Sequence, residues 1–230
     1  MDTTSSAFLI EPIATIHNGY SSKFGIPRQS GRASEALSTI VFEKPYRVQE
    51  ALRGMEAYSH LWLIWQFSAC PQGAFRPTVR PPRLGGNTRV GVFATRSPFR
   101  PNRLGLSSVR LESIEKTKHE GMVLIVSGAD LMDGTPIFDI KPYISYTDSH
   151  PDAVCGFAEA QSGYRLTVYC PEELLRPLAP RTRATLLQML ENDPRPAYQH
   201  DETRVYAFEF EGHAVRFSVD GKTLTVHAIV

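Results

Sequence analysis

Arginine is concentrated in one segment of this chain, from Arg76 to Arg110. The segment contains eight arginines and no aspartate or glutamate, whereas the whole chain has 25 Lys+Arg and 24 Asp+Glu, a formal net charge of +1. A guanidinium group offers a rigid set of donors that matches phosphate oxygens. The segment therefore fits either a phosphate-rich partner or a solvated basic face with counter-charges from the more acidic second half. Charge alone leaves both interpretations open.

The central part of this segment is Gly91–Leu106, with the sequence GVFATRSPFRPNRLGL. We expect a strand to end near Ala94, and Arg96, Arg100 and Arg103 follow it, spaced by two prolines. Because proline fixes φ, such a loop is stiff and holds its charged groups in place. The same pattern also fits a rigid turn that is merely decorated with arginine.

A second segment, residues 130–146 (DLMDGTPIFDIKPYISY), combines a turn with polar side chains. Asp133–Gly134 is a turn signal, and an extended stretch follows it. Alternation along that stretch places Asp139 and Lys141 on one face. The two side chains fit either a surface ion pair worth less than ~1 kcal/mol or a catalytic role.

Several classes of chemistry lack their sequence patterns. There is no GxGxxG or GxxxxGK[ST] turn, so Rossmann and P-loop sites are not predicted, and no GxSxG hydrolase signature. The seven histidines are scattered, and we predict no metal site. The three cysteines show no CxxC spacing, which indicates a reducing compartment. Without a long apolar stretch or a secretory signal, we expect a cytoplasmic protein and no membrane contact.

A mainly β scaffold must position these groups. Apolar and β-branched stretches separated by Gly-, Pro- and Asn-rich loops favour a small closed or nearly closed β-barrel over a β-α-β wound sheet. A short helix is expected over Pro45–Tyr58. The predicted strands cover residues 7–17, 38–43, 59–67, 89–95, 107–113 and 122–127.

The pattern changes near residue 152. Residues 171–193 are typical of a helix interrupted by two prolines, and the last strands form a hairpin around Asp220–Gly221. We therefore predict two domains, a barrel over residues 1–152 and a small C-terminal α+β domain over residues 153–230. The second domain could extend a binding surface, cap the barrel or pack a dimer.

Four segments together resemble a known family. GVFATRSPFRPNRLGLS and DGTPIFDIKPYISY, with GIPRQ and SHLWLIW upstream, are similar in order and spacing to the TsaA/TrmO family over Ile10–Tyr146. The resemblance implies a non-Rossmann β-barrel tRNA methyltransferase with S-adenosyl-L-methionine as cofactor. Its acceptor would be N6 of the threonylcarbamoyl-adenosine at position 37. The anticodon arm would be its partner, and a homodimer with the cofactor near the subunit interface its typical assembly.

The resemblance also assigns individual residues. The implied cofactor-binding set is Pro27, Arg28, Gln29, His60, Leu61, Arg96, Leu106, Asp133, Gly134, Thr135 and Pro136. Within it, Arg96 suits the cofactor carboxylate and the DGTP turn suits the adenine. The arginines expected to bind anticodon-arm phosphates are Arg76, Arg80, Arg83, Arg100 and Arg103. Asp139 and His60 are the candidate bases, and orientation without a dedicated base is an equal contender.

Two other functions fit the same residues. A non-catalytic RNA-binding module could use these arginines, and it would show steep salt dependence and ignore S-adenosylmethionine. A methyltransferase for a small metabolite would not depend on Arg80 or Arg83. Phe99 could stack on an unpaired base or anchor its own loop in the core.

Overall fold

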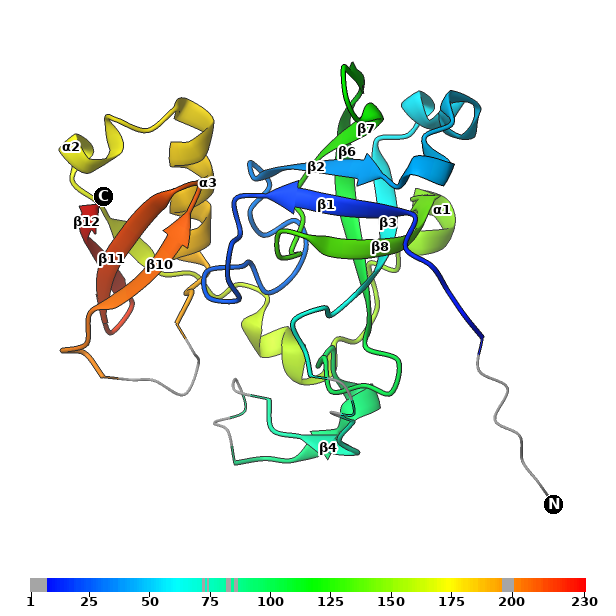
Figure 1. Cartoon of the computed structure of the whole chain (residues 1–230). Coiled ribbons are helices and arrows are strands. Elements are labelled where there is room, and N and C mark those ends of the chain that lie inside the picture. Colours follow the sequence, from blue (N-terminus) through cyan, green and yellow to red (C-terminus); the bar gives the residue numbers. More distant parts are fainter. Residues whose placement is uncertain (1–7, 72, 74, 82–83, 85–86, 196–200) are drawn as a thin grey trace.

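The chain forms a six-stranded barrel with a smaller α+β unit beside it (Figure 1). The computed structural model describes residues 8–71, 73, 75–81, 84, 87–195 and 201–230. The barrel order is β1-β2-β7-β6-β3-β8, and it closes because β8 pairs with β1. The strands are β1 Ala14–Asn18, β2 Leu37–Phe42, β3 His60–Gln66, β6 Leu104–Thr117, β7 Gly121–Ser127 and β8 Thr135–Pro142. The predicted mainly β fold with a closed, non-Rossmann barrel is confirmed.

Aliphatic side chains fill the barrel interior, because successive residues of a strand point alternately inward and outward. In β3, for example, Leu61 and Leu63 are fully buried and their neighbours are partly exposed. Ile16, Ile40 and Ile137 share the same core. The barrel is therefore a packed core, and its chemistry must lie at its ends or on its outer surface.

Two predicted elements of the N-terminal half are wrong in detail. The strand expected over residues 89–95 is reduced to β5 (Val90–Gly91), which pairs with β4 (Thr78–Val79) and is followed by a 3-10 turn over Val92–Ala94. The helix expected over Pro45–Tyr58 is replaced by 3-10 turns at Lys44–Tyr46, Gln49–Leu52 and Met55–Ala57. Gly54, with a φ of 86°, separates the last two turns, and this left-handed conformation ends any longer helix.

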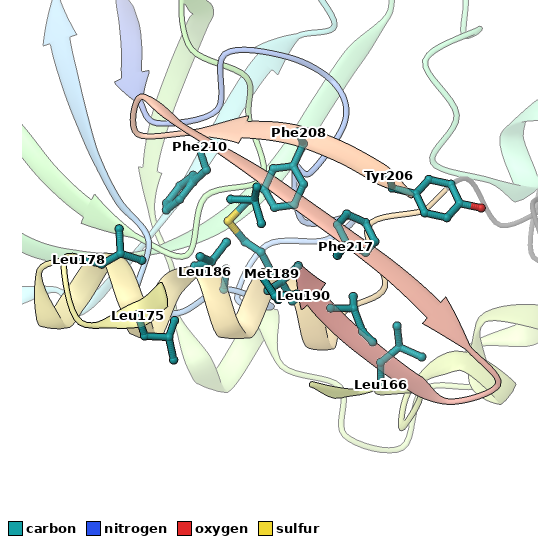
Figure 2. Close-up of a cluster of buried hydrophobic side chains, with 14 of the residues drawn as sticks. Leu166, Leu175, Leu178, Leu186, Met189, Leu190, Tyr206, Phe208, Phe210 and Phe217 are labelled. Carbon is teal, nitrogen blue, oxygen red and sulfur yellow. The ribbon is translucent and has the colours of Figure 1, made fainter. Parts of the chain in front are cut away.

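The C-terminal unit packs one face of a four-stranded sheet against a helix. The sheet order is β10-β11-β12-β9, and β9 runs parallel to β12. Figure 2 shows Leu186, Met189 and Leu190 of the helix beside Phe208 and Phe217 of the sheet. The elements are β9 Thr167–Tyr169, α2 Glu172–Leu175, α3 Pro180–Glu191, β10 Tyr206–Phe210, β11 His213–Asp220 and β12 Thr223–Ile229, and α1 (Ser145–Asp148) precedes them. The predicted break of the helical stretch at the prolines is present.

The sheet has two hairpins, whereas the sequence predicted one, with its turn at Asp220–Gly221. Asp220 pairs with Thr223, so the two-residue loop between β11 and β12 is Gly221–Lys222, one residue later than predicted. The loop between β10 and β11 is Glu211–Gly212, with φ angles of 49° and 79°. Two positive φ angles are the mark of a type I′ turn, so that geometry occurs at a Glu-Gly pair.

The long loop between β1 and β2 packs on the C-terminal unit. Tyr20, Ala33 and Ala36 belong to the hydrophobic core that contains α3 and the C-terminal sheet, and Phe24 and Ile26 pack against it. Residues from both halves of the chain therefore build the second core. The division at residue 152 stays a prediction.

Candidate functional site

A large open cleft of about 1260 Å³ lies between the arginine-rich loops and the C-terminal unit. Its lining comes from residues 28–32, from residues 76–99, and from residues 155–165 with Asn192. Seven arginines line it and, among the residues that the structure describes, no aspartate or glutamate does. Walls of one charge sign concentrate the electrostatic field and attract ligands of the opposite sign. The cleft is therefore suited to an anionic ligand.

Arg96 joins two segments of the site that are far apart in the sequence. Its guanidinium donates a short hydrogen bond to the side-chain carbonyl of Gln29. Arg28 lines the same cleft and donates to the main-chain carbonyl of Arg195 at 2.5 Å, while Pro27 is buried behind it. The structure thus brings Arg28, Gln29 and Arg96 to one end of the cleft. Their contact with a cofactor stays a prediction.

Two of the arginines predicted to bind phosphate, Arg76 and Arg80, line the cleft. The Arg76 guanidinium lies 4.8 Å from the centre of the Phe99 ring, a cation–π distance. Phe99 is half-buried and also lines the cleft. Its ring therefore packs against the Arg76 guanidinium. Arg83 lies outside the described residues.

The other two, Arg100 and Arg103, are engaged with main-chain carbonyls of the protein. Arg100 donates to the main-chain carbonyl of Thr95 at 2.6 Å, and Arg103 donates to that of Cys70 at 2.6 Å. Neither is among the described residues that line the cleft. These bonds satisfy loop carbonyls and stiffen the segment between Arg96 and β6.

The structure adds cleft residues that the sequence analysis did not select as ligand contacts. Phe93 is 73% exposed and Phe157 is 38% exposed, and both line the cleft. Arg89 and Arg165 also line it. Arg89 lies in the arginine-rich segment, so its charge was a usable signal. Nothing in the sequence spacing connects Phe157 or Arg165 to that segment.

The predicted turn Asp133–Pro136 is held against the end of β1. The Asp133 carboxylate accepts from the N–H of Asn18 at 3.0 Å, and Gly134, with a φ of 73°, donates its N–H to Ile16 at 2.9 Å. Thr135 is buried and begins β8. The turn is well ordered by these bonds, but it is not part of the cleft lining, and its contact with an adenine stays a prediction.

His60 and Leu61 lie at the other end of the barrel from this turn. Leu61 pairs with Pro142 of β8, which is six residues from Pro136 and hence about 20 Å away at the rise of a strand. Leu106 lies between the two ends, on β6, and is 56% exposed. One chain therefore does not bring all the predicted cofactor residues together.

Asp139 lies on the outer surface of the barrel. A register shift in β8 places Asp139 opposite Ile64 but Ile137 opposite Trp65. The Asp139 carboxylate is 2.9 Å from the Lys141 ammonium, and both side chains are partly exposed. The surface ion pair considered above is thus present. A role in proton transfer for Asp139 or His60 stays a prediction.

Asp130, which the sequence analysis did not select, is a mostly buried carboxylate near Arg96. Ser107 donates its hydroxyl to Asp130 at 2.5 Å, and the Trp65 indole N–H donates to Ser107 at 2.9 Å. Burial raises the pKa of Asp130, although the Ser107 bond and the Arg96 charge oppose this. Its position three residues after the end of the apolar strand β7 was the available signal for burial.

Neither a metal centre nor a membrane span is found in the part of the chain that the structure describes. No group of three or more His, Cys, Asp or Glu is placed there to hold a metal ion. No helix there is long and apolar enough to cross a membrane. The three cysteines are free.

A closed six-stranded barrel with an arginine-lined cleft defines a β-barrel protein for an anionic ligand, without a Rossmann or P-loop site. The chain belongs to the TrmO family. The tRNA-methyltransferase O N-terminal domain matches residues 15–149, and the TrmO C-terminal domain matches residues 168–230. The resemblance read from the four sequence segments is thereby confirmed.

Relatives match over most of the chain. A protein of Escherichia coli strain K12 named tRNA (adenine(37)-N6)-methyltransferase is 39% identical over 232 residues, 97% of this chain and 98% of the relative. A putative S-adenosylmethionine-dependent methyltransferase of Pseudomonas aeruginosa is 42% identical and covers 84% of each chain. The crystal structure of TrmO from Pseudomonas aeruginosa superposes with a TM-score of 0.79, at 32% identity, over 100% of this chain and 99% of that one.

Proposed function

We propose that this chain is an S-adenosylmethionine-dependent methyltransferase that acts on N6 of adenosine 37 in tRNA, with threonylcarbamoyl-adenosine as the acceptor. The observation that carries the proposal is the arginine-lined cleft that ends at Arg96 and Gln29. The name of the Escherichia coli relative, tRNA (adenine(37)-N6)-methyltransferase, supports the acceptor atom. The phosphates of a tRNA match the charge of the cleft.

The residues at the Arg96 end fit S-adenosylmethionine by their chemistry. Arg96 offers charge-assisted donors to the carboxylate of the cofactor. The Gln29 carbonyl already accepts from Arg96, so its amide group is left to donate to a ligand. When bound, the cofactor supplies an electrophilic methyl group on a sulfonium centre. The name of the Pseudomonas aeruginosa relative supports this choice of cofactor.

The chain itself contributes binding and orientation of the acceptor, which is where most of the catalysis in a methyl transfer arises. Arg76 and Arg80 hold the flanking phosphates of the anticodon arm in this proposal. The threonylcarbamoyl group makes the N6 proton more acidic, so a modest base is enough to remove it. Asp139 and His60 are the predicted bases.

We further propose that the protein is a cytoplasmic homodimer. Within one chain His60 and Leu61 lie at the opposite barrel end from the turn Asp133–Pro136, so a second copy would be needed to complete a site that contains both. Free cysteines accord with a reducing compartment. Cell fractionation tests the location. The protein is expected in the cytosolic fraction, and its recovery in the membrane fraction would contradict the proposal.

The first experiment is methyl transfer from labelled S-adenosylmethionine into total tRNA. Transfer is expected into tRNA from cells that make threonylcarbamoyl-adenosine, and not into tRNA from cells that lack it. Arg96→Ala is expected to lower transfer by about 10- to 100-fold, since hydrogen bonds to charged groups are worth about 1.5–3 kcal/mol. Arg216→Ala, an exposed arginine of β11 outside the cleft, is the matched control.

The outcomes separate the candidate functions. Label in neither tRNA pool, with salt-dependent tRNA binding intact, would leave the RNA-binding module in place of the enzyme. The curated names do not favour that alternative. Equal label in both pools would remove the threonylcarbamoyl requirement but keep the methyltransferase. Full activity of Arg96→Ala would contradict the proposed role of Arg96 in binding the cofactor carboxylate.

A further inference from the structure

We infer that residues 155–159 and 162–165, from the C-terminal half, form a binding wall for an unpaired strand of RNA, opposite the arginine-rich loops. The inference rests on the proposed function and assigns a part of the RNA site to the C-terminal half. The four family motifs lie in the N-terminal half, and the sequence analysis left the C-terminal half open between a binding surface, a barrel cap and a dimer contact. The structure places Phe157 and Arg165 on the lining of the same cleft as Arg80 and Arg89.

The side chains of this wall have the right chemistry for a nucleotide strand. Arg165 is exposed and donates one guanidinium N–H to the main-chain carbonyl of its neighbour Tyr164 at 2.8 Å. Since a guanidinium carries five N–H donors, others remain for a phosphate. Phe157 is 38% exposed in the 3-10 segment Gly156–Gln161, and an exposed phenyl face is suited to base stacking.

The opposite wall offers the same pair of groups. Phe93 is 73% exposed, and Arg89 lines the cleft near it in the sequence. An unpaired strand presents phosphates and accessible base faces, whereas a duplex hides its bases in the stack. An acidic protein would meet the arginines but would leave both phenyl rings without a stacking partner. The combination therefore favours unpaired RNA, such as a tRNA loop.

Hydrogen bonds hold this wall in place relative to the loop that carries Arg28 and Gln29. Arg32 donates to the carbonyl of Ser162 at 3.0 Å, and Asn192 donates to the carbonyl of Arg32 at 3.0 Å. Further along, Gln188 of α3 accepts from the N–H of Glu35 and donates to the hydroxyl of Ser34, each at 3.1 Å. A wall that is fixed before binding loses little entropy when RNA arrives.

A further hydrogen bond and an ion pair hold the loop that carries Arg28. Arg195, whose carbonyl accepts from Arg28, is buried and ion-paired with Asp193 at 2.9 Å. Burial raises the pKa of Asp193, but the bonds and charge of Arg195 outweigh it and hold that pKa below its usual range. The charged pair therefore stays formed at neutral pH and anchors the loop that carries Arg28 to the end of α3.

The test compares Arg165→Ala and Phe157→Ala with the wild type and with the control Arg216→Ala. The binding of purified tRNA is measured over a range of salt concentrations, and S-adenosylmethionine binding is measured by calorimetry. Arg165→Ala is expected to weaken tRNA binding and to lower its salt slope by about 0.7, the value for one phosphate on a single strand. Phe157→Ala is expected to weaken binding about five- to 100-fold with an unchanged slope, and Phe157→Tyr to restore it.

Both variants are expected to bind S-adenosylmethionine as the wild type does, and the control to be unchanged in every assay. Unaltered tRNA affinity in both variants overturns the inference, and so does a parallel loss of cofactor affinity, which would make the segment a support for the loop that carries Arg28 and Gln29. If the wild type transfers no methyl group but the variants lose tRNA affinity, the wall stands and the proposed enzyme fails. If the wild type transfers the methyl group and both variants keep the tRNA affinity of the wild type, the proposed enzyme stands and the wall fails.

Discussion

Arg96 is the residue through which the two main segments of the site are connected. It donates to Gln29 from one segment, and its charge acts on Asp130, which is held by Ser107 from β6. These neighbours fix the guanidinium before a ligand arrives. A side chain that is already ordered loses less entropy on binding than a free one.

The mostly buried Asp130 carboxylate lowers the free energy of unfolding at neutral pH. Because its pKa is raised in the folded chain, the folded state binds a proton more tightly than the unfolded state does. The ionised carboxylate therefore destabilises the fold at neutral pH, and this cost disappears as the pH falls below the ordinary carboxyl pKa of about 4. The Ser107 bond survives in an amide, since an asparagine oxygen also accepts.

Asp130→Asn is accordingly expected to raise the free energy of unfolding at neutral pH, with a gain that shrinks toward pH ~4. Urea unfolding at several pH values measures this difference. Asp152→Asn, at an exposed position after α1, is the control and is expected to change little. A loss of stability at neutral pH in Asp130→Asn would show that the Arg96 charge outweighs burial.

At the scale of elements, the close contact between β6 and β3 depends on a glycine. A Cβ added to Gly105 would lie 2.3 Å from the Trp65 ring. The ring is fixed, because its N–H donates to Ser107 and it packs in a T-shaped arrangement with Phe67 at a centroid distance of 4.4 Å. An added methyl group must therefore displace either the strand or the ring.

Gly105→Ala is expected to cost about 1–3 kcal/mol of stability, the usual range for overpacking a core, and to shift the tryptophan fluorescence. Gly91→Ala is the control, since a Cβ there meets nothing within 4 Å. Equal stability of the two variants, together with an unchanged emission spectrum, would contradict the tight packing of Trp65 on β6.

The sequence predicted the barrel because apolar, β-branched stretches are separated by loops rich in Gly, Pro and Asn. It failed at RVGVFAT, which has the same composition, because one hydrogen bond to a distant residue and one from a side chain close the segment into a turn. The N–H of Val92 donates to Pro77 at 3.0 Å, and the Thr95 hydroxyl donates back to Val92 at 2.8 Å. Such distant and side-chain bonds leave no trace in local hydropathy.

Only a part of the candidate site could be predicted from the sequence, because tertiary packing brings the other residues to it. Arg28, Gln29 and Arg96 were recognised from family motifs, and the structure places them together at one end of the cleft. Phe157 and Arg165 reach the cleft only through the packing of the C-terminal unit beside the barrel (Figure 1). No spacing rule within a single chain connects residues that tertiary packing alone brings together.

At the scale of the whole molecule, a composite site makes a sharp prediction. If Arg96 of one subunit and His60 of another share a site, Arg96→Ala and His60→Ala are each expected to lose transfer. A mixed dimer of the two variants retains one intact site, so a random mixture recovers about a quarter of the wild-type activity. Co-expression of differently tagged variants, followed by the methyl-transfer assay, measures this recovery.

Failure to recover activity in dimers that demonstrably contain both variants would place every essential residue within one chain. In that case the separation of His60 from the turn Asp133–Pro136 would exclude one of them from the cofactor site. Arg216→Ala mixed with Arg96→Ala controls for the effect of tagging and exchange.

The fastening of the loop between β1 and β2 also has a consequence for biosynthesis. The loop that carries Gln29 leaves the ribosome early, but its partners Ser162, Gln188, Asn192 and Arg195 are made much later. The nascent barrel strands are all synthesised before those partners appear. The site therefore stays unassembled on the growing chain, and binding competence arrives only near the end of translation.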